Sequence, residues 1–424
     1  MGGALRSLKV PCPTPAWSAL LNRAHRLGQP FLYWRDPGTG QTLMGVGVCA
    51  EFAGDGIEAL RAAHDWLEEQ SAGSALDAAP SWFAATFDYG AGRDEWTAWR
   101  GLRLVVPQVL VEAREGVATA QLMGFDEGGL ETARSLWDAL VVGRRDKPPE
   151  GAVQFEAPRW VETPAAFEAR AARAIKRLGG ALKKVVLANA RRLPWRGDGI
   201  ARALDRLASS PRDGVHFACS QGAGSLWVGC TPETLVEQRG DDFRAHILAG
   251  TRTRQSETSA AELLRSEKDR REHDLVAQGM IESLEPLAQQ IVVPEEPSIR
   301  TLDHLLHLQR TLEGQTLPGV GFLELVAALH PTPALGGYPQ AGAVADLERF
   351  EPLHRGAYGA PFGWIRGRQR GHAAVAIRSA LLCEADATIF AGAGVVEHSV
   401  PADERAEVEA KMASIERELL GRTP

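Results

Sequence analysis

The sequence predicts a mixed α/β fold with extensive sheet, on the basis of three observations. Residues 28–125 alternate short β-like runs with turn residues, and one helix around Gly56–Gln70 interrupts them. After Thr163 and Pro164, helical patterns alternate with short apolar runs that are typical of buried strands. Between these two parts, the polar segment 143–153 contains Gly and Pro and therefore predicts a linker.

The individual elements follow from local signals. Four apolar runs bounded by turn residues predict the N-terminal strands: 30–52, 81–90, 102–113 and 116–125. In the second part, Thr163 followed by Pro164 predicts a helix start, because proline suits the first helical position. The helices expected from there on cover about 164–178, 199–209, 259–290, 321–329 and 402–419. The strands expected between them cover 184–188, 214–219, 225–229, 234–238, 372–380 and 387–391.

Composition excludes several classes of protein. The 424 residues carry a net charge of −7, so the basic surface that binds nucleic acid is missing. No apolar run approaches the roughly 18 residues that a membrane span needs, and the N-terminus lacks the apolar core of a signal peptide. The five cysteines are scattered and form no CxxC pair, which indicates reduced thiols. We therefore expect a cytoplasmic protein with no nucleic-acid or membrane partner.

Two charged positions border predicted strands. In ALKKVVLANARR, residues 181–192, Lys183 and Lys184 lie at the mouth of a short apolar run. Lysine is usually exposed, so the pair is either a solvated strand end or contains one buried, chemically active amine. Glu233 follows Pro232 in a turn between two apolar runs. It is either a solvated turn residue or an acid placed for chemistry.

Two helices each carry a pair of carboxylates three residues apart, a spacing that puts both on one helix face. The first pair is Asp269 and Glu272, and the second is Glu404 and Glu407. Nearby cations, including Lys411 four residues after Glu407, make ordinary surface ion pairs one explanation. The other is a site for Mg²⁺, which takes one or two protein carboxylates and fills its remaining positions with water and substrate.

Further candidate groups lie in glycine-rich segments and in one apolar run. Glycines allow the backbone to approach an anion, and they cluster in 249–251, 336–339, 359–364 and 392–399. Arg378 lies in a predicted strand, where its charge must be paired with a protein acid or a substrate carboxylate. His304 and His307 have i,i+3 spacing, but a zinc site would need two further ligands that the sequence does not place.

Eight segments occur in one order that resembles the chorismate-utilising enzymes, a family that includes isochorismate, salicylate and anthranilate synthases. The segments are KVVLA, GCTPETLVE, ILAGTRTR, SEKDRREHDLV, LHPTPALGG, RGAYGAPFGWI, AIRSALL and GAGVVEHSVPADERAEVEAK. They cover about residues 155–420. The resemblance implies an α+β fold with a large two-lobed β-sandwich core and helices packed outside. It also implies that a β-rich part, 1–150, and a chorismate-binding catalytic part, 155–424, form one structural unit.

The resemblance assigns a role to each candidate. Lys184 matches a general base acting on water, and Glu233 matches a general acid on the opposite face of the substrate ring. Glu272 and Glu407 match Mg²⁺ ligands. Asp269 and Glu404 match carboxylates that support these ligands. Matches to substrate-binding groups are Gly250, Thr251, His307, Tyr358, Arg378, Gly392, Gly394 and Lys411. Moving a hydroxyl from C4 to C2 of chorismate needs such a base and acid, because water is deprotonated while hydroxide leaves.

Within the family, the lysine favours water over ammonia as the nucleophile, and the chain contains no amidotransferase domain. We therefore expect an isochorismate synthase that needs no amidotransferase subunit and acts as a monomer or homodimer. The alternatives are a salicylate synthase, which also eliminates pyruvate, and a non-catalytic chorismate-binding subunit. The sequence departs from the family pattern at Asn189, where an arginine is expected, at Arg405 and Val408, and in GAYGAP, residues 356–361, where a version with a bulky residue is more common. The product's pathway, whether menaquinone, siderophore or salicylate, stays open.

Overall fold

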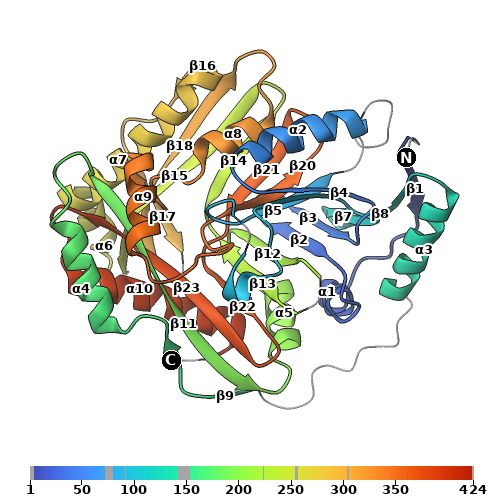
Figure 1. Ribbon diagram of the computed structural model, residues 1–424, viewed down its shortest axis with the longest axis horizontal. Coiled ribbons are helices and arrows are strands. Elements are labelled where there is room, and N and C mark those ends of the chain that lie inside the picture. The colour runs from blue at the N-terminus through green and yellow to red at the C-terminus, as the bar shows by residue number, and fades with distance from the viewer. Residues whose placement is uncertain are drawn as a thin grey trace.

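The computed structural model describes residues 4–71, 80–90, 92–141, 153–222, 224–253, 256–302 and 305–422. Nearly all of the predicted linker 143–153, and also His304, lie outside these residues. Figure 1 shows two large sheets with helices on the outside of the molecule. This arrangement confirms the predicted α+β class with a β-sandwich core.

The first sheet is antiparallel and contains strands from both halves of the chain. Its neighbours in order are β1 (Arg6–Val10), β8 (Val117–Gly124), β7 (Val109–Arg114), β3 (Gln41–Val46), β2 (Phe31–Asp36), β12 (Val215–Ser220), β13 (Leu226–Thr231), β22 (Ser379–Leu382), β23 (Asp386–Val396), β11 (Lys184–Arg196) and β10 (Arg159–Trp160). Two short strands also pair with β11: β9 (Gln154–Phe155) and β19 (Gly337–Tyr338). Strand β11 is therefore paired along both edges at its start, where β19 lies on one side and β23 on the other.

The second sheet is also antiparallel and packs against the first. Its order is β16 (Ala288–Val292), β18 (Leu305–Thr316), β15 (Asp242–Thr253), β14 (Thr234–Arg239), β21 (Arg370–Val375), β20 (Pro361–Ile365), β5 (Ser81–Ala85), β6 (Leu102–Val106) and β4 (Ala50–Gly54), with β17 (Ser298–Leu302) beside β18. Aromatic side chains fill the space between the sheets. Phe362 on β20 contacts both Trp34 on β2 and Phe217 on β12, with ring centroids 5.5 and 4.2 Å apart.

Helices cover the outer faces of the sheets (Figure 1). They are α1 (Trp17–Arg26), α2 (Glu58–Ser71), α3 (Glu127–Val141), α4 (Pro164–Ile175), α5 (Gly199–Ser209), α6 (Ser259–Arg265), α7 (Glu267–Leu284), α8 (Phe322–Leu329), α9 (Gln340–Phe350) and α10 (Pro401–Ile415). A π-helical turn, Glu416–Leu420, continues α10. The predicted start of α4 is confirmed, because Thr163 caps it by accepting a hydrogen bond from the Ala166 N–H at 3.3 Å. No helix in the described ranges is long and apolar enough to cross a bilayer.

Several predicted elements differ in extent from the structure: the strand expected over 184–188 continues to Arg196, and two other elements are interrupted. The single helix expected over 259–290 is broken at Ser266, whose hydroxyl caps α7 by accepting a hydrogen bond from the Asp269 N–H, and the chain then enters β16. The single strand expected over 372–380 ends at Val375 as β21 and resumes at Ser379 as β22. Between them Arg378 has φ 52°, a left-handed conformation that no strand residue adopts. The chain changes sheets at this break.

A second change of sheet lies next to the first. Strand β13 belongs to the first sheet and β14 to the second, so the chain crosses between the sheets at Pro232 and Glu233. The two crossings are hydrogen-bonded to each other: the Val375 N–H donates to the Glu233 carbonyl at 3.1 Å, and the Cys230 N–H donates to the Arg378 carbonyl at 3.2 Å. Both crossings therefore hold their charged residues at the seam of the sandwich.

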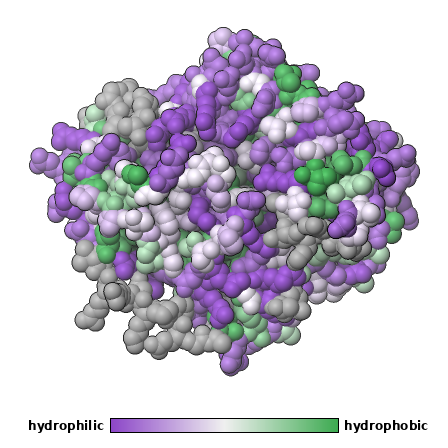
Figure 2. Space-filling model, turned by 180° about the vertical axis from the view of Figure 1, so that it is seen from behind, coloured by the Kyte–Doolittle hydropathy of each residue, from purple (hydrophilic) through white to green (hydrophobic). Residues whose placement is uncertain are grey.

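The outer surface gives no sign of a single large apolar face on the side that Figure 2 presents. Hydrophilic residues cover most of that view, and hydrophobic residues form small, separate patches. Scattered apolar residues of this kind are normal on the surface of a globular protein. This face therefore presents no large apolar binding surface, and the candidate sites are the cavities.

Candidate active site

A cavity of about 70 Å³ at the seam of the two sheets brings the predicted site residues together. Of the predicted residues, those that line it are Lys184, Glu233, Gly250, Thr251, Glu272, His307, Tyr358, Arg378, Gly392, Gly394, Glu407 and Lys411. Asp269 and Glu404 lie outside the lining, each three residues before a carboxylate that does line it. The structure thus gathers twelve residues that are spread over more than 220 positions of the chain.

Lys184 is the buried member of the lysine pair. It begins β11, where pairing to β19 and β23 leaves its side chain only 1% exposed. Its Nζ donates to Glu272 Oε1 at 2.8 Å, which supplies the counter-charge that a buried ammonium requires. The neighbouring Lys183 is half-buried, and its Nζ donates to the Gly179 carbonyl at 3.2 Å. Of the two readings of the lysine pair, the solvated strand end is therefore wrong for Lys184.

Gly394 on β23 makes room for this ion pair. A Cβ at that position would lie 2.2 Å from Glu272 Oε1 and 2.9 Å from Lys184 Cε. Both distances are far below van der Waals contact. The glycine is thus required by packing, and the sequence signal that marked it was the cluster of glycines in 392–399.

Glu233 is a buried acid and not a solvated turn residue. It is 4% exposed, and its backbone N–H donates to Thr231 Oγ1 at 3.2 Å. Burial raises the pKa of its carboxyl to about 7, although the positive charges of Lys184 and Lys411 oppose the shift. A carboxyl with this pKa is partly protonated near neutral pH and can donate a proton.

One member of each helical carboxylate pair lines the cavity, Glu272 from α7 and Glu407 from α10. Glu272 on α7 contacts Lys184, and Glu407 on α10 accepts from Lys411 Nζ at 2.5 Å. Lys411 also donates to the Gly392 carbonyl at 2.8 Å. The Glu407–Lys411 pair is therefore the expected i,i+4 ion pair, but it lines the cavity and is mostly buried.

The supporting carboxylates are also buried. Glu404 is 2% exposed and accepts from Lys268 Nζ at 2.8 Å. Burial raises the pKa of Asp269. In the part of the chain that the structure describes, no three His, Cys, Asp or Glu side chains are close enough together to enclose a metal ion by themselves. Two cavity-facing carboxylates, Glu272 and Glu407, still match the donor set of an ion that shares its ligands with water and substrate.

His307 and Arg378 form one wall of the cavity. The His307 ring lies between Thr251 Oγ1, 2.9 Å from Nδ1, and Arg378 Nη2, 3.3 Å from Nε2. Burial and the Arg378 charge hold the pKa of His307 well below its ordinary value, so the ring is neutral. A neutral ring can accept from Arg378 and contribute to a polar wall for an anion.

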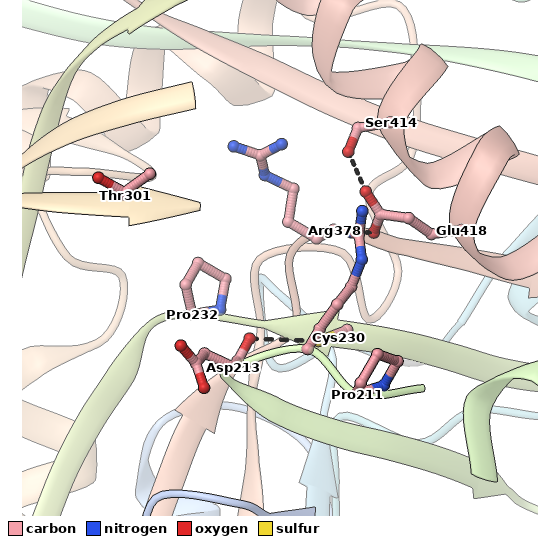
Figure 3. Close-up of a pocket in the computed structure, with 9 residues that line it drawn as sticks. Pro211, Asp213, Cys230, Pro232, Thr301, Arg378, Ser414 and Glu418 are labelled. Atoms are coloured by element: carbon pink, nitrogen blue, oxygen red, sulfur yellow. Dashed lines mark hydrogen bonds and ion pairs between the residues drawn. The ribbon is translucent and has the colours of Figure 1, made fainter. Parts of the chain in front are cut away.

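Arg378 also faces a second cavity, of about 330 Å³, which shares Arg378 and Pro232 with the first. Figure 3 shows its side chain projecting between Thr301 on β17 and Ser414 on α10. An ion pair between Arg212 and Glu418 lines this second cavity. Arg378 thus lines both cavities.

Several cavity residues were not predicted from the sequence. Apolar groups complete the lining: Val186, Pro232, Leu248, Ala249, Ala334, Leu335, Ile377, Phe390 and Ala391. Tyr358 stacks on Phe390 with ring centroids 5.6 Å apart. Phe390 could have been found, because it alternates with Gly392 and Gly394 along one face of β23.

Three of the departures from the family pattern, Asn189, Arg405 and Val408, lie outside this cavity, whereas the altered segment GAYGAP contains the lining residue Tyr358. Asn189 is buried and its side-chain amide donates to the Glu162 carbonyl at 2.9 Å, so it organises the chain before α4. Arg405 pairs with Glu168 and Glu409 on the outer side of α10. Val408 is 2% exposed in the core.

Comparisons with known proteins identify the family and the fold that this chain resembles. A family described as "Chorismate binding enzyme" matches residues 3–420. "Salicylate biosynthesis isochorismate synthase" of Pseudomonas aeruginosa is 31% identical over 409 residues, which cover 92% of this chain and 85% of that protein. "Isochorismate synthase MenF" of Bacillus subtilis is 35% identical over 235 residues, covering 54% of this chain and 50% of that protein. The structure of the menaquinone-specific isochorismate synthase MenF from Escherichia coli has a TM-score of 0.84 and 24% identity, covering 99% of this chain and 95% of that one, which shows a shared fold.

The buried acid predicts a pH-dependent stability. Because the folded-state pKa of Glu233, about 7, lies above the ordinary 4.5, the folded protein holds the proton more tightly than the unfolded chain. The contribution of Glu233 to the free energy of unfolding therefore falls as the pH rises from about 4.5 to 7. We expect Glu233→Gln to raise Tm by roughly 2–5 °C at pH 8 and by progressively less toward pH 5, measured by thermal unfolding.

Glu237 is the matched control on the next strand. Burial alone would raise its pKa, but His372, Arg244 and Arg239 outweigh burial and lower it. Glu237→Gln should therefore lower Tm at pH 8. A loss of stability of similar size in both variants would show that Glu233 is ionised and stabilising, contrary to its environment.

Proposed function

This chain belongs to the family of chorismate-binding enzymes, and from that premise we propose that it is an isochorismate synthase. The reaction adds water at C2 of chorismate and removes the hydroxyl at C4. The observation that carries the proposal is one cavity that holds a buried lysine, Lys184, together with a buried acid whose pKa is raised, Glu233. These are the two groups that proton removal at one ring position and proton delivery at another require.

Lys184 would act as the base. A buried amine at the end of a paired strand is held in a fixed direction, which favours proton transfer from a positioned water. The role requires the amine to be released from its ion pair with Glu272.

Glu233 would act as the acid. Hydroxide is a poor leaving group, so the departing C4 oxygen needs a proton as its bond to carbon breaks. With a pKa of about 7, Glu233 holds that proton in a large fraction of molecules at neutral pH. After the reaction its carboxylate would be stabilised by Lys184 and Lys411, whose charges favour the ionised form.

The remaining groups would hold the two substrate carboxylates. We propose that Arg378 and Tyr358 bind one of them, with neutral His307 and Thr251 orienting the Arg378 guanidinium. Close approach of substrate to the backbone is possible at Gly250, which has φ 78°, and along the glycines of β23. Lys411 adds a second cation on the side of α10.

We further propose that Glu272 and Glu407 hold Mg²⁺, with Asp269 and Glu404 as supporting carboxylates. The support is chemical: two carboxylates, Glu272 and Glu407, face one cavity from separate helices, and each forms an ion pair with a lysine. When bound, Mg²⁺ would neutralise charge on a substrate carboxylate. The carboxylate pairs of α7 and α10 would then take part in the reaction and would not be ordinary surface ion pairs.

Salicylate synthase is the second candidate. The Pseudomonas aeruginosa relative carries salicylate biosynthesis in its name, and that statement concerns that protein alone. A salicylate synthase would form the same intermediate and then eliminate pyruvate, so the same cavity could serve it. We propose that the protein acts in the cytoplasm and needs no amidotransferase subunit. Lys184 supports the second point, because a lysine at this position favours water over ammonia as the nucleophile.

The base assignment predicts unequal effects of the two neighbouring lysines. Lys184→Ala should lower kcat for chorismate conversion at least ~100-fold, because a positioned general base contributes about that much. Lys183→Ala should stay within a few-fold of wild type, since Lys183 lies outside the cavity. Steady-state kinetics with thermal unfolding as a folding control distinguishes the two. Similar losses in both variants would contradict a specific role for Lys184.

Product identity tests the function itself. Purified protein incubated with chorismate and Mg²⁺ should give isochorismate in equilibrium with chorismate, identified by chromatography, since no group is consumed. EDTA should stop the reaction and added Mg²⁺ should restore it. A lactate-dehydrogenase-coupled assay measures pyruvate, the product that distinguishes the second candidate. Stoichiometric pyruvate without an isochorismate pool would favour salicylate synthase. Activity that persists in EDTA would remove Mg²⁺ from the proposal.

A further inference from the structure

Arg355 is a buried arginine behind the active site. It lies in the loop that leads from α9 to Tyr358, and its side chain is 3% exposed. It does not belong to the lining of the active-site cavity. Its hydrogen bonds nevertheless reach three residues that do line the cavity: Val186, Leu335 and Tyr358.

These hydrogen bonds join separate walls of the cavity. Arg355 Nη2 donates to the Val186 carbonyl at 2.7 Å, and Nη1 donates to the Leu335 carbonyl at 2.8 Å. The Arg355 carbonyl accepts from the Tyr358 N–H at 2.9 Å. Val186 follows Lys184 by two positions on β11, so both side chains point to the same face of the strand. One residue therefore fixes the strand that carries the proposed base relative to two other walls.

Arg355 takes the place of a missing strand at this edge of β11. Among the strands that the structure describes, none pairs with residues 186–190 on the edge opposite β23. Glu351 makes the next contact along this edge, since its Oε1 accepts from the Ala188 N–H at 2.8 Å. Val186 is 4% exposed, so its carbonyl depends on a protein donor for its hydrogen bond. Side chains thus complete the hydrogen bonding of the strand directly after Lys184.

Glu351 and Phe87 hold the guanidinium in this orientation. Glu351 Oε2 accepts from Arg355 Nε at 2.6 Å and Oε1 accepts from Nη2 at 2.9 Å, which makes a bidentate ion pair between two buried side chains. Arg355 Cζ lies 4.4 Å from the centroid of the Phe87 ring. A lysine cannot reproduce these contacts, because its ammonium is a point charge and lacks the planar fork of donors.

We propose that Arg355 is a positioning residue for the reaction: it sets the direction of Lys184 through the Val186 backbone and the place of Tyr358 through its own carbonyl. The inference rests on the proposed function, in which Lys184 removes a proton from water and Tyr358 binds a substrate carboxylate. A displacement of about 1 Å at a reacting group can cost about 100-fold in rate. Arg355 itself touches no substrate, so its loss affects kcat more than substrate affinity.

Arg170 on α4 is a matched control at the same strand edge. Its side chain is 4% exposed and forms a bidentate ion pair with Glu162, in which Nε and Nη2 lie 3.0 and 2.6 Å from Oε2. Its Nη2 also donates to the Ala188 carbonyl at 2.7 Å. Neither Glu162 nor Ala188 lines the active-site cavity. Loss of Arg170 therefore removes the same kinds of buried contact without reaching a lining residue.

Arg355→Lys and Arg170→Lys test the proposal in the full chain. Thermal unfolding should show a similar loss of Tm in both variants, because each loses a buried bidentate pair. With chorismate and Mg²⁺, Arg355→Lys should lower kcat roughly 10- to 100-fold. Isothermal titration of chorismate in EDTA should show a Kd raised by only about two- to fivefold, the effect of one weakened hydrogen bond. Arg170→Lys should keep both the kcat and the Kd of wild type.

Equal losses of kcat in the two variants, or a folded Arg355→Lys variant with the kcat of wild type, would overturn the proposal. If Arg355→Lys does not fold, Glu351→Gln replaces it, because this change removes the counter-charge of Arg355 and keeps an acceptor; its kcat should fall further than that of Arg170→Lys. A wild type that binds chorismate without forming isochorismate would contradict the proposed function. The Kd values in EDTA would then decide, and equal values in wild type and Arg355→Lys would overturn the positioning role as well.

Discussion

The burial of one charged lysine constrains the whole active site. Lys184 is 1% exposed at the start of a strand that is paired on both edges, and an ammonium in that position is unstable without an opposite charge. Glu272 supplies the charge from α7, and it reaches the lysine because Gly394 on β23 has no side chain. One ion pair therefore ties two strands and a helix around the cavity. Removing either partner would leave a buried charge uncompensated.

The second determinant is the double change of sheet. At Glu233 and at Arg378 the chain leaves one sheet and enters the other, and hydrogen bonds between the two crossings hold them side by side. Residues at a crossing lie between the sheets, and Glu233 is buried there. The same geometry that buries Glu233 raises its pKa to about 7, while Arg378 accepts a left-handed φ of 52° to make its crossing. The backbone topology thus determines where both side chains lie and, for Glu233, the burial that raises its pKa.

Local signals predicted much of the fold, and long-range packing decided the rest. The bounds of α5 agree with the predicted 199–209, because Asp198 caps its first turn and the amphipathic pattern is complete within the segment. The break at Ser266 was missed, since charged residues on both sides continue a helical pattern through the cap. The burial of Glu233 could not be predicted from its turn, because strands distant in sequence exclude the solvent. For the site, motif order identified twelve of the lining residues, whereas the pairing of Lys184 with Glu272 depends on a contact across 88 positions.

In the proposed reaction, Lys184 and Glu233 exchange one hydroxyl for another by way of external water. Conversion of chorismate in H₂¹⁸O tests this exchange, with mass spectrometry and ¹³C isotope shifts to locate the label in the product. We expect one ¹⁸O atom, in the hydroxyl at C2, with the original oxygen released from C4. A product that carries unlabelled oxygen at C2 would mean that the hydroxyl migrates within the substrate, and it would contradict the assignment of Lys184 as the base that activates water.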